Sequence, residues 1–198
     1  MLCLKANFEV DDMKFFVMYA ETNITEYVKP GKDIEVLRKG CQKSEFQFLN
    51  HSPLKIEIAD DSGIEFPDFL LNKSIPLISA GIKQTFDELN IDNLFYKPIQ
   101  LTLEERGIAE NYWLALPPRI NCLDIERSVI EVEDNEFVMP TELIREANKI
   151  VINESQVGRY EIFKLAGVVN QEIIVTEQLK NVLETENFEN VYFYELEE

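Results

Sequence analysis

Two stretches of the chain that lie 97 residues apart carry the same pattern, and this repetition restricts the fold more than any other feature. Leu77–Ile99 aligns without gaps on Ile174–Leu196. In both stretches an apolar run precedes a hydroxyl residue, Ser79 or Thr176, and an amphipathic stretch, an asparagine-containing turn and an aromatic run follow. The pattern predicts two copies of a strand, a helix cap, a helix, a turn and a strand. Unrelated strand–helix–strand segments can also look alike, so duplication is one of two interpretations.

Each of the two expected helices, near 80–89 and 177–186, has one apolar stripe. The stripes are formed by Ile82, Phe86 and Leu89 in the first helix and by Leu179, Val182 and Leu183 in the second. Such a stripe needs a second layer that covers it, and a sheet can supply that layer. We therefore expect an α+β fold in which two similar strand–helix–strand units surround a mixed sheet.

The first 60 residues are expected to be rich in β-strands, because short apolar and aromatic runs alternate there with turn residues. The strands predicted in this part are Lys14–Ala20, Asp33–Leu37, Glu45–Leu49 and Leu54–Ala59. Further along, the predicted elements are strands at Ile75–Ile78, Leu94–Leu101, Tyr112–Leu116, Arg127–Val132 and Lys149–Ile152, and a helix from Pro140 to about Asn148. The chain is thus divided into a β-rich N-terminal part, residues 1–60, and an α+β domain, residues 61–198, which contains the repeat.

The composition excludes several classes of protein. Hydrophobic residues make up 45% of the chain, which is enough for a sizeable core and excludes a disordered protein. No stretch approaches the roughly 20 apolar residues that a membrane span requires. The N-terminal residues lack the basic start and long apolar run of a secretory signal, so we expect a cytoplasmic protein without membrane contact.

Acidic residues outnumber basic ones by 37 to 19, which gives a net charge of −18. The first 99 residues carry 16 acidic and 11 basic groups, and residues 100–198 carry 21 and 8. A surface this negative repels phosphate backbones, so we expect no nucleic-acid binding. It attracts basic protein partners, although a high net charge can also serve solubility alone.

Motifs for catalysis, cofactors or metals are missing from the sequence. Its one histidine, His51, and three cysteines lack metal-ligand spacing, so we expect no metal, disulfide or cofactor. A Cys122–His51 dyad is conceivable, but the apolar neighbours of Cys122 indicate a buried thiol. Asp124 and Glu126 could serve as an acid and base, but beside Arg127 they indicate a surface ion-pair cluster. The aromatic pairs and the Tyr192-Phe193-Tyr194 run indicate core packing in strands. No catalytic residue is predicted.

Residues from about 60 to 198 resemble a family of bacterial immunity proteins, formerly a domain of unknown function. The likeness lies in FPDFLLNKSIPLISAGIKQTFDELNIDNLFYKPIQL, in YWLALPPRINCLDIERSVIEVEDN and in GRYEIFKLAGVVNQEIIVTEQLKNVLETENFENVYFYEL. The resemblance implies a non-enzymatic protein of a polymorphic-toxin system that binds a cognate toxin and neutralises it by occlusion. It brings no set of toxin-contacting residues, and the first 60 residues match poorly.

Charge then suggests where a toxin, expected to be basic, would bind. We predict the acidic C-terminal half, with one cluster on a turn and another around the end of the second helix. The candidate residues are Glu131, Glu133, Asp134, Glu136, Glu184, Glu186 and Glu189. Two other function classes stay open: a hydrolase that uses Asp and Glu, and an adaptor or structural protein of a secretion system. The sequence leaves the oligomeric state open.

Overall fold

The computed structural model describes residues 13–34, 37, 54–72, 74–132, 144–169 and 172–196. The strands are β1 (Phe15–Tyr19), β2 (Leu54–Glu57), β3 (Phe69–Asn72), β4 (Ile75–Ile78), β5 (Phe95–Leu103), β6 (Ile108–Leu116), β7 (Arg119–Ile120), β8 (Val129–Val132), β9 (Ile144–Lys149), β10 (Ile162–Leu165), β11 (Ile173–Thr176) and β12 (Tyr192–Glu195). The helices are α2 (Ala80–Glu88), α3 (Glu154–Val157) and α4 (Glu177–Glu186), with 3₁₀ turns η1 (Lys32–Ile34) and η3 (Glu104–Arg106). The predicted α+β fold class is confirmed.

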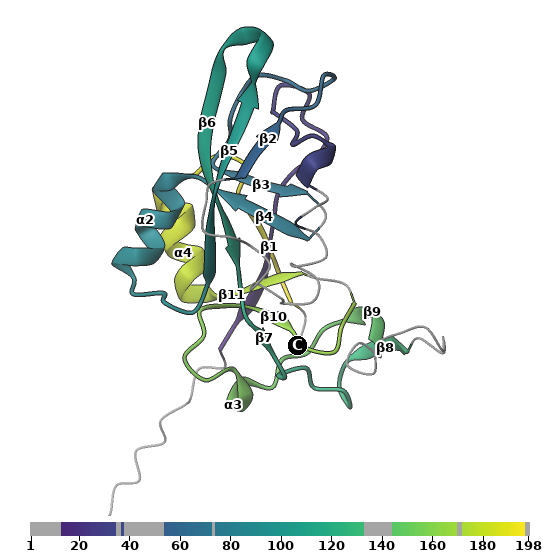
Figure 1. Cartoon of the computed structure of the whole chain (residues 1–198). Helices are drawn as coiled ribbons and strands as arrows, with labels where there is room; N and C mark the ends of the chain where they lie inside the picture. Colours follow the sequence, from purple (N-terminus) through teal and green to yellow (C-terminus); the bar gives the residue numbers. More distant parts are fainter. Residues whose placement is uncertain are drawn as a thin grey trace, which may run out of the picture.

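The described strands form two five-stranded sheets and one two-stranded ribbon (Figure 1). The first sheet has the order β12-β1-β11-β10-β7, and the second has the order β2-β5-β6-β4-β3. The ribbon consists of β8 and β9, which pair antiparallel. Figure 1 shows α2 and α4 side by side on one side of the molecule, and the ribbon lies away from them at its lower right. Each predicted unit thus contributes to a different sheet.

Apolar side chains pack on both faces of each sheet and form three clusters in the interior. The central cluster joins α2 and α4 to one face of each sheet, through side chains such as Phe16, Ile78, Ile82, Phe86, Val175, Leu179 and Leu183. The second cluster covers the other face of the second sheet and includes Val28, Ile34, Leu37, Ile56, Leu77, Ile99, Leu114 and Leu116. The third covers the other face of the first sheet and includes Phe15, Cys122, Ile144, Ile152, Phe163 and Ile174. Neighbouring residues of one strand therefore belong to different clusters, because side chains alternate between faces.

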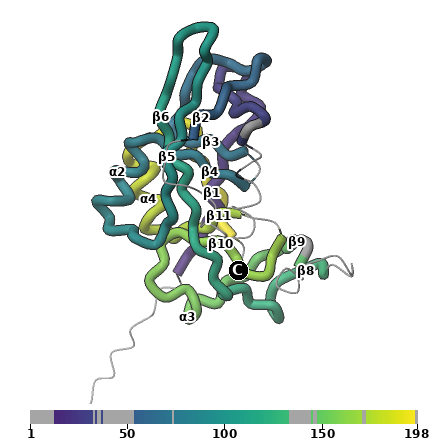
Figure 2. Tube along the Cα trace, viewed as in Figure 1, coloured from purple at the N-terminus to yellow at the C-terminus, as the bar shows by residue number. Residues whose placement is uncertain are grey.

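The two helical units have the same topology. In the second sheet β4, α2 and β5 follow one another, and β6 lies between β4 and β5, antiparallel to both. In the first sheet β11, α4 and β12 follow one another, and β1 lies between β11 and β12, again antiparallel to both. The central strand β6 follows its unit in the chain. The central strand β1 comes instead from the N-terminal end of the chain. The tube in Figure 2 shows this, since purple β1 runs among yellow-green strands.

The pairing registers of the two units also agree. Ile78 lies opposite Trp113, as Val175 lies opposite Phe16, and each pair joins the strand before a helix to the central strand. The strand after each helix follows the same rule, because Phe95 is paired with Leu116 and Tyr192 with Tyr19. Every position of β5 in this comparison is 97 residues before its equivalent in β12. The same registers therefore assign equivalent places to Lys97 and Tyr194.

Helix caps and turns repeat as well. The Ser79 hydroxyl accepts a hydrogen bond from the Ile82 amide at 3.3 Å, and the Thr176 hydroxyl accepts one from the Leu179 amide at 3.4 Å. These bonds satisfy amides that the helix itself leaves without partners. Both helices end at an asparagine with positive φ, Asn90 at 56° and its equivalent Asn187 at 55°. The predicted helices and their caps are confirmed, and descent from a duplication stays a prediction.

Two equivalent asparagines link the units, because each donates a hydrogen bond to the backbone of a strand in the other sheet. Asn93, after α2, donates from Nδ2 to the carbonyl oxygen of Ile162 at 3.1 Å. Asn190, after α4, donates from Nδ2 to the carbonyl oxygen of Phe69 at 2.9 Å. Ile162 and Phe69 are the first residues of β10 and β3, so each unit binds the entering strand of the other. Asn190 is buried and also exchanges two hydrogen bonds with the Glu21 backbone.

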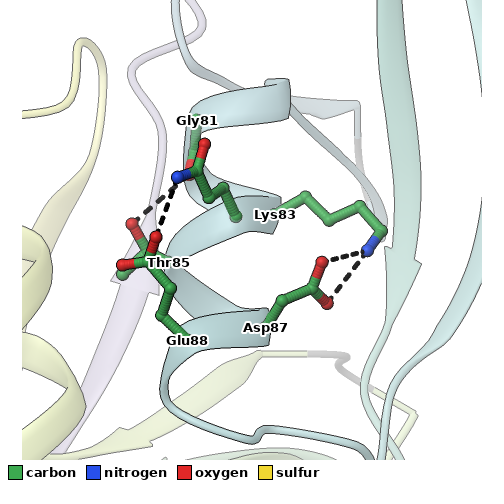
Figure 3. Close-up of polar contacts among 6 residues, drawn as sticks. Gly81, Lys83, Thr85, Asp87 and Glu88 are labelled. Atoms are coloured by element: carbon green, nitrogen blue, oxygen red, sulfur yellow. Dashed lines mark hydrogen bonds and ion pairs between the residues drawn. The ribbon is translucent and has the colours of Figure 1, made fainter.

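The solvent-facing side of α2 is occupied by contacts within the helix (Figure 3). Lys83 Nζ lies 2.7 Å from a carboxylate oxygen of Asp87, one turn further along. The Thr85 hydroxyl donates to the carbonyl oxygen of Gly81 at 3.3 Å. Lys83 Nζ also lies 5.3 Å from the Trp113 ring centroid, as Lys180 Nζ lies 5.0 Å from that of Phe16 in the equivalent place. The lysines therefore cover the aromatic rings of the central strands.

Several predicted elements are wrong. Residues 32–34 form a 3₁₀ turn in place of the predicted Asp33–Leu37 strand, because the Ile34 amide bonds back to the Gly31 carbonyl. The predicted helix from Pro140 to Asn148 is strand β9 from Ile144 onward, since pairing with β8 outweighs local helix propensity. The Lys149–Ile152 strand reduces to the end of β9 and one bridge between Ile152 and Leu123. Glu45–Leu49 lies outside the described residues.

We predict that Asn190→Ala lowers the free energy of unfolding by about 1–3 kcal/mol, because it leaves the Phe69 carbonyl and the Glu21 backbone groups unsatisfied. Asn93→Ala removes one bond and should cost about 1 kcal/mol. Urea denaturation measures both values. Asn111→Ala, at an exposed site, is the matched control. Equal stabilities of the Asn190 variant and the control would contradict the assigned role.

Candidate functional site

Exposed apolar and aromatic side chains gather at two places on the described surface, and each place includes residues of the acidic C-terminal half of the chain. The first place is the β8 edge, which we define as Ile125, Val129, Glu131 and Val132. The second is a row of tyrosines on and beside β12. Exposed aromatic and apolar groups of this kind are typical of protein-binding surfaces.

The β8 edge combines apolar and acidic side chains on β8, which pairs with β9, and on the turn before it. Ile125, Val129 and Val132 are 60%, 55% and 58% exposed, and Glu131 is exposed between the two valines. The turn before the strand is fixed by Asp124, whose Oδ1 accepts hydrogen bonds from the amides of Glu126 and Arg127 at 3.2 Å each. Asp124 therefore stabilises a turn. The sequence analysis considered Asp124 only together with Glu126 and did not predict this role.

The structure describes only some of the residues in the two predicted acidic clusters. Glu131 lies on β8, whereas Glu133, Asp134 and Glu136 lie outside the described residues. The second predicted cluster is exposed around the end of α4. In Figure 1 α4 and β8 are on opposite sides of the molecule, so Glu131 and the second cluster belong to different regions of the surface.

The members of the second cluster differ in their partners. Glu184 forms an ion pair with Lys180 at 2.7 Å, one turn earlier in α4. The backbone of Glu189 is held by its amide bond to Asp68 Oδ2 at 2.9 Å and by the Phe69 amide, which donates to its carbonyl oxygen. Glu186 is exposed. Glu189 is thus the member with the most firmly positioned main chain, and it lies next to the tyrosines.

The tyrosine row consists of Tyr194, Tyr19, Tyr192 and Tyr27. The Tyr19 ring centroid lies 5.6 Å from that of Tyr192 and 5.8 Å from that of Tyr194. Tyr192 and Tyr194 are 39% and 45% exposed, and Tyr19 and Tyr27 are half-buried. Tyr27 is placed by backbone bonds to residues 63–65, and a Cβ atom at Gly63 would overlap the carbonyl oxygen of Glu26. Glycine is therefore required there for the approach that holds Tyr27 in position.

Carboxylates border the row at both ends. The Tyr194 hydroxyl donates to Glu172 Oε1 at 2.9 Å, and burial together with this carboxylate raises the pKa of Tyr194. Burial also raises the pKa of Tyr27, and the charge of Glu189 and the nearby Tyr192 hydroxyl add to the effect. Tyr27 and Tyr194 accordingly stay neutral hydrogen-bond donors at physiological pH.

Two hollows adjoin the row. One, of about 440 Å³, is lined mainly by apolar groups and by Glu21, Tyr27, Asn72 and Asn190. The other, of about 240 Å³, lies between β9 and Tyr194 and is bordered by Glu172, Lys149 and Leu196 among others. The second hollow lies between the tyrosine row and β9, the strand that pairs with β8.

Among the described residues, the groups that the sequence suggested for catalysis or metal binding do not come together in a site. Cys122 is fully buried in the third cluster, and burial raises the pKa of its thiol to about 12, so it is not a nucleophile. Its conceivable partner His51 lies outside the described residues. Within the ranges given above, no group of His, Cys, Asp and Glu is placed to hold a metal ion. No described helix is long and apolar enough to cross a membrane.

The tyrosine row was not predicted as a surface. The Tyr192-Phe193-Tyr194 run was interpreted as core packing, and only Phe193 packs against the central cluster. Alternation along a strand places Tyr192 and Tyr194 on the opposite face from Phe193. The sequence contained this signal, but which face remained uncovered depended on segments distant in the chain.

Comparison with known proteins gives one family. Residues 22–198 match the immunity protein family (Imm11). None of the curated proteins matches the chain. The matched range starts well before residue 60, so it includes the segment that carries Tyr27 in addition to both helical units.

We predict that Cys122 does not react with iodoacetamide at pH 8 in the folded protein, because a thiol with a pKa near 12 is almost entirely protonated there. A Cys3→Ser/Cys41→Ser variant isolates this thiol, and mass spectrometry counts the added groups. The same variant unfolded in urea should be alkylated and serves as the control. Fast modification of the folded chain would contradict the buried position of Cys122.

Proposed function

This chain belongs to the immunity protein family, and from that premise we propose that it binds a cognate bacterial toxin in the cytoplasm and neutralises it by covering its active site. The observation that carries the proposal is the family match over residues 22–198. The inhibition is stoichiometric, because one bound molecule blocks one toxin and no reaction is needed.

The charge of the chain supports a basic toxin as the partner. The net charge is −18, and 21 of the 37 acidic residues lie in residues 100–198. A cleft that acts on phosphate-containing substrates is positively charged, and acidic side chains complement it. Such complementarity speeds the encounter of two proteins and orients them before contact.

In this proposal two kinds of side chain form the contact with the toxin: acidic side chains, and apolar or aromatic side chains that act as anchors. Glu131 on the β8 edge and Glu189 beside the tyrosine row supply charge, and the exposed apolar and aromatic groups next to them supply buried area. Charged groups at the rim of an interface chiefly affect the association rate, whereas anchors at its centre determine how long the complex lasts.

A co-expression experiment tests the proposed function. The toxin domain encoded beside this gene is produced in a bacterial host with and without the chain, and survival is measured. We expect growth only when the chain is present, together with a one-to-one complex by native mass spectrometry. Protection without a complex, or a complex without protection, would contradict inhibition by occlusion.

We further predict that the association rate falls steeply as salt rises, because exposed charges are screened within about 10 Å at 0.1 M. Two variants test the acidic clusters: Glu131→Gln/Glu133→Gln/Asp134→Asn/Glu136→Gln, and Glu184→Gln/Glu186→Gln/Glu189→Gln. Each should slow association more than it speeds dissociation, as surface plasmon resonance can measure. The fold should be kept, because exposed ion pairs contribute at most about 1 kcal/mol each.

The control for these variants is Glu104→Gln/Glu105→Gln/Glu110→Gln. These three carboxylates are exposed where β5 and β6 turn back, at the top of Figure 1 and away from both clusters. The control changes the net charge by the same three units as the second variant. If the control variant slows association as much as the cluster variants do, the slower association results from the change in total charge. It then gives no support for an interface in the acidic half.

A further inference from the structure

The equivalence of the two units shows what is unusual about the tyrosine row. The registers place Tyr192 where Phe95 lies in the other unit, Tyr194 where Lys97 lies, and Tyr19 where Leu116 lies. Lys97 and Leu116 are 4% and 3% exposed, and Phe95 packs against the second cluster. Tyr194 is 45% exposed. The same face at the same register is therefore covered in one sheet and open in the other.

The cover on the second sheet is a layer of chain. Val28, Ile34 and Leu37, together with β2, bury the face that carries Phe95 and Leu116. On the first sheet the corresponding layer includes Cys122, Leu123, Ile144 and Ile152 and reaches Phe15, Ile174 and Leu196. Among the described residues it does not extend over Tyr192 and Tyr194, which remain exposed. The tyrosine row thus marks where the described part of the covering layer ends and the side chains of the sheet are exposed.

The residues at this place suit a surface that is covered by another protein. Tyrosine combines a large apolar ring with a polar tip, so it tolerates water when free and buries a large area when bound. The three rings on β1 and β12 pack against one another, and the Tyr194 hydroxyl is held by Glu172. Rings ordered in this way lose little conformational freedom on binding.

The charge around the row selects a basic occupant. Glu172 and Glu189 lie at its two ends, and Glu26 and Glu65 add to the negative field at Tyr27. Three described basic groups lie nearby: Lys14 is paired with Glu195 at 3.0 Å, and Lys29 and Lys149 each line one of the two hollows. A guanidinium group is planar, stacks on aromatic faces and forms paired hydrogen bonds with carboxylates, whereas an ammonium group does not stack in this way.

We propose that the tyrosine row binds an extended, arginine-containing segment of the toxin, which supplies the layer that this sheet lacks. The inference rests on the proposed function for the identity of the partner. Arginine side chains stack on Tyr192 and Tyr194 and pair with Glu172 and Glu189. The hollows at the two ends receive the side chains that flank the arginines.

The first experiment uses the toxin domain encoded beside the gene and measures its affinity by calorimetry. Tyr192→Ala/Tyr194→Ala should weaken binding by about 30-fold or more, as the loss of a central anchor does. Tyr192→Phe/Tyr194→Phe keeps the rings and should stay within about five-fold of the wild type. The matched control is Gln100→Ala/Asn111→Ala, which removes an exposed cross-strand pair on β5 and β6. Wild-type affinity in the alanine variant would overturn the proposal and leave the proposed function intact.

The second experiment needs no toxin and therefore separates the two hypotheses. A peptide of alternating glycine and arginine is titrated into the full chain, and the tyrosine ring signals are followed by NMR. A glycine–lysine peptide of equal length and charge is the comparison. We expect shifts at Tyr19, Tyr192 and Tyr194, and binding about two- to five-fold tighter for arginine than for lysine.

The outcomes of the peptide titration are distinct. Equal binding of the two peptides, or shifts that persist in Tyr192→Leu/Tyr194→Leu, would overturn recognition of arginine by the row. The leucine variant keeps apolar volume on the strand, and circular dichroism confirms that it is folded. If the toxin domain fails to bind the wild type while the arginine peptide behaves as expected, the proposed function fails and the arginine surface stands.

Discussion

Burial of two apolar helix stripes in one shared core is the constraint on which the rest of this structure depends. Ile82 and Phe86 of α2 lie in the same cluster as Leu179 and Leu183 of α4, together with side chains from both sheets. Neither helix could bury its stripe alone, because each unit supplies only one face of one sheet. The sheets must therefore lie close to each other, and Asn93 and Asn190 can reach across to the opposite units.

The same scaffold used twice also explains how one sheet presents an exposed aromatic surface while the equivalent face of the other sheet is covered. In one unit a layer of chain covers the outer face of the sheet, and the residues there are apolar or buried. In the other unit the layer covers only part of that face, and tyrosines occupy the uncovered positions. The difference between the units lies outside the repeat, in the segments that pack on it. Such a division allows the exposed part of a scaffold to differ while the core stays the same.

In the proposed complex with a basic toxin, charged and aromatic residues have separate tasks. Carboxylates spread over the C-terminal half attract a basic protein from a distance and depend on the salt concentration. Tyrosines act only in contact, where their rings exclude water. Glu172 links the two, because it orders the Tyr194 hydroxyl and carries charge at the end of the row. An inhibitor that must outpace damage by its toxin benefits from fast encounter and slow release, and these depend on different residues.

The sequence by itself determined the parts of the fold that are encoded locally. The caps Ser79 and Thr176, the helices after them and the apolar runs around them were predictable, because caps and periodicity depend on neighbours in the chain. It also determined the excess of negative charge. The tertiary structure alone decided that Ile144–Lys149 is a strand, because pairing with β8 provides hydrogen bonds that the local sequence does not specify. The tertiary structure alone placed β1 between β11 and β12. It also left Tyr192 and Tyr194 exposed, whereas their equivalents Phe95 and Lys97 are covered. Which face of a strand is covered depends on segments far away in the chain, and a local pattern contains no information on where those segments end.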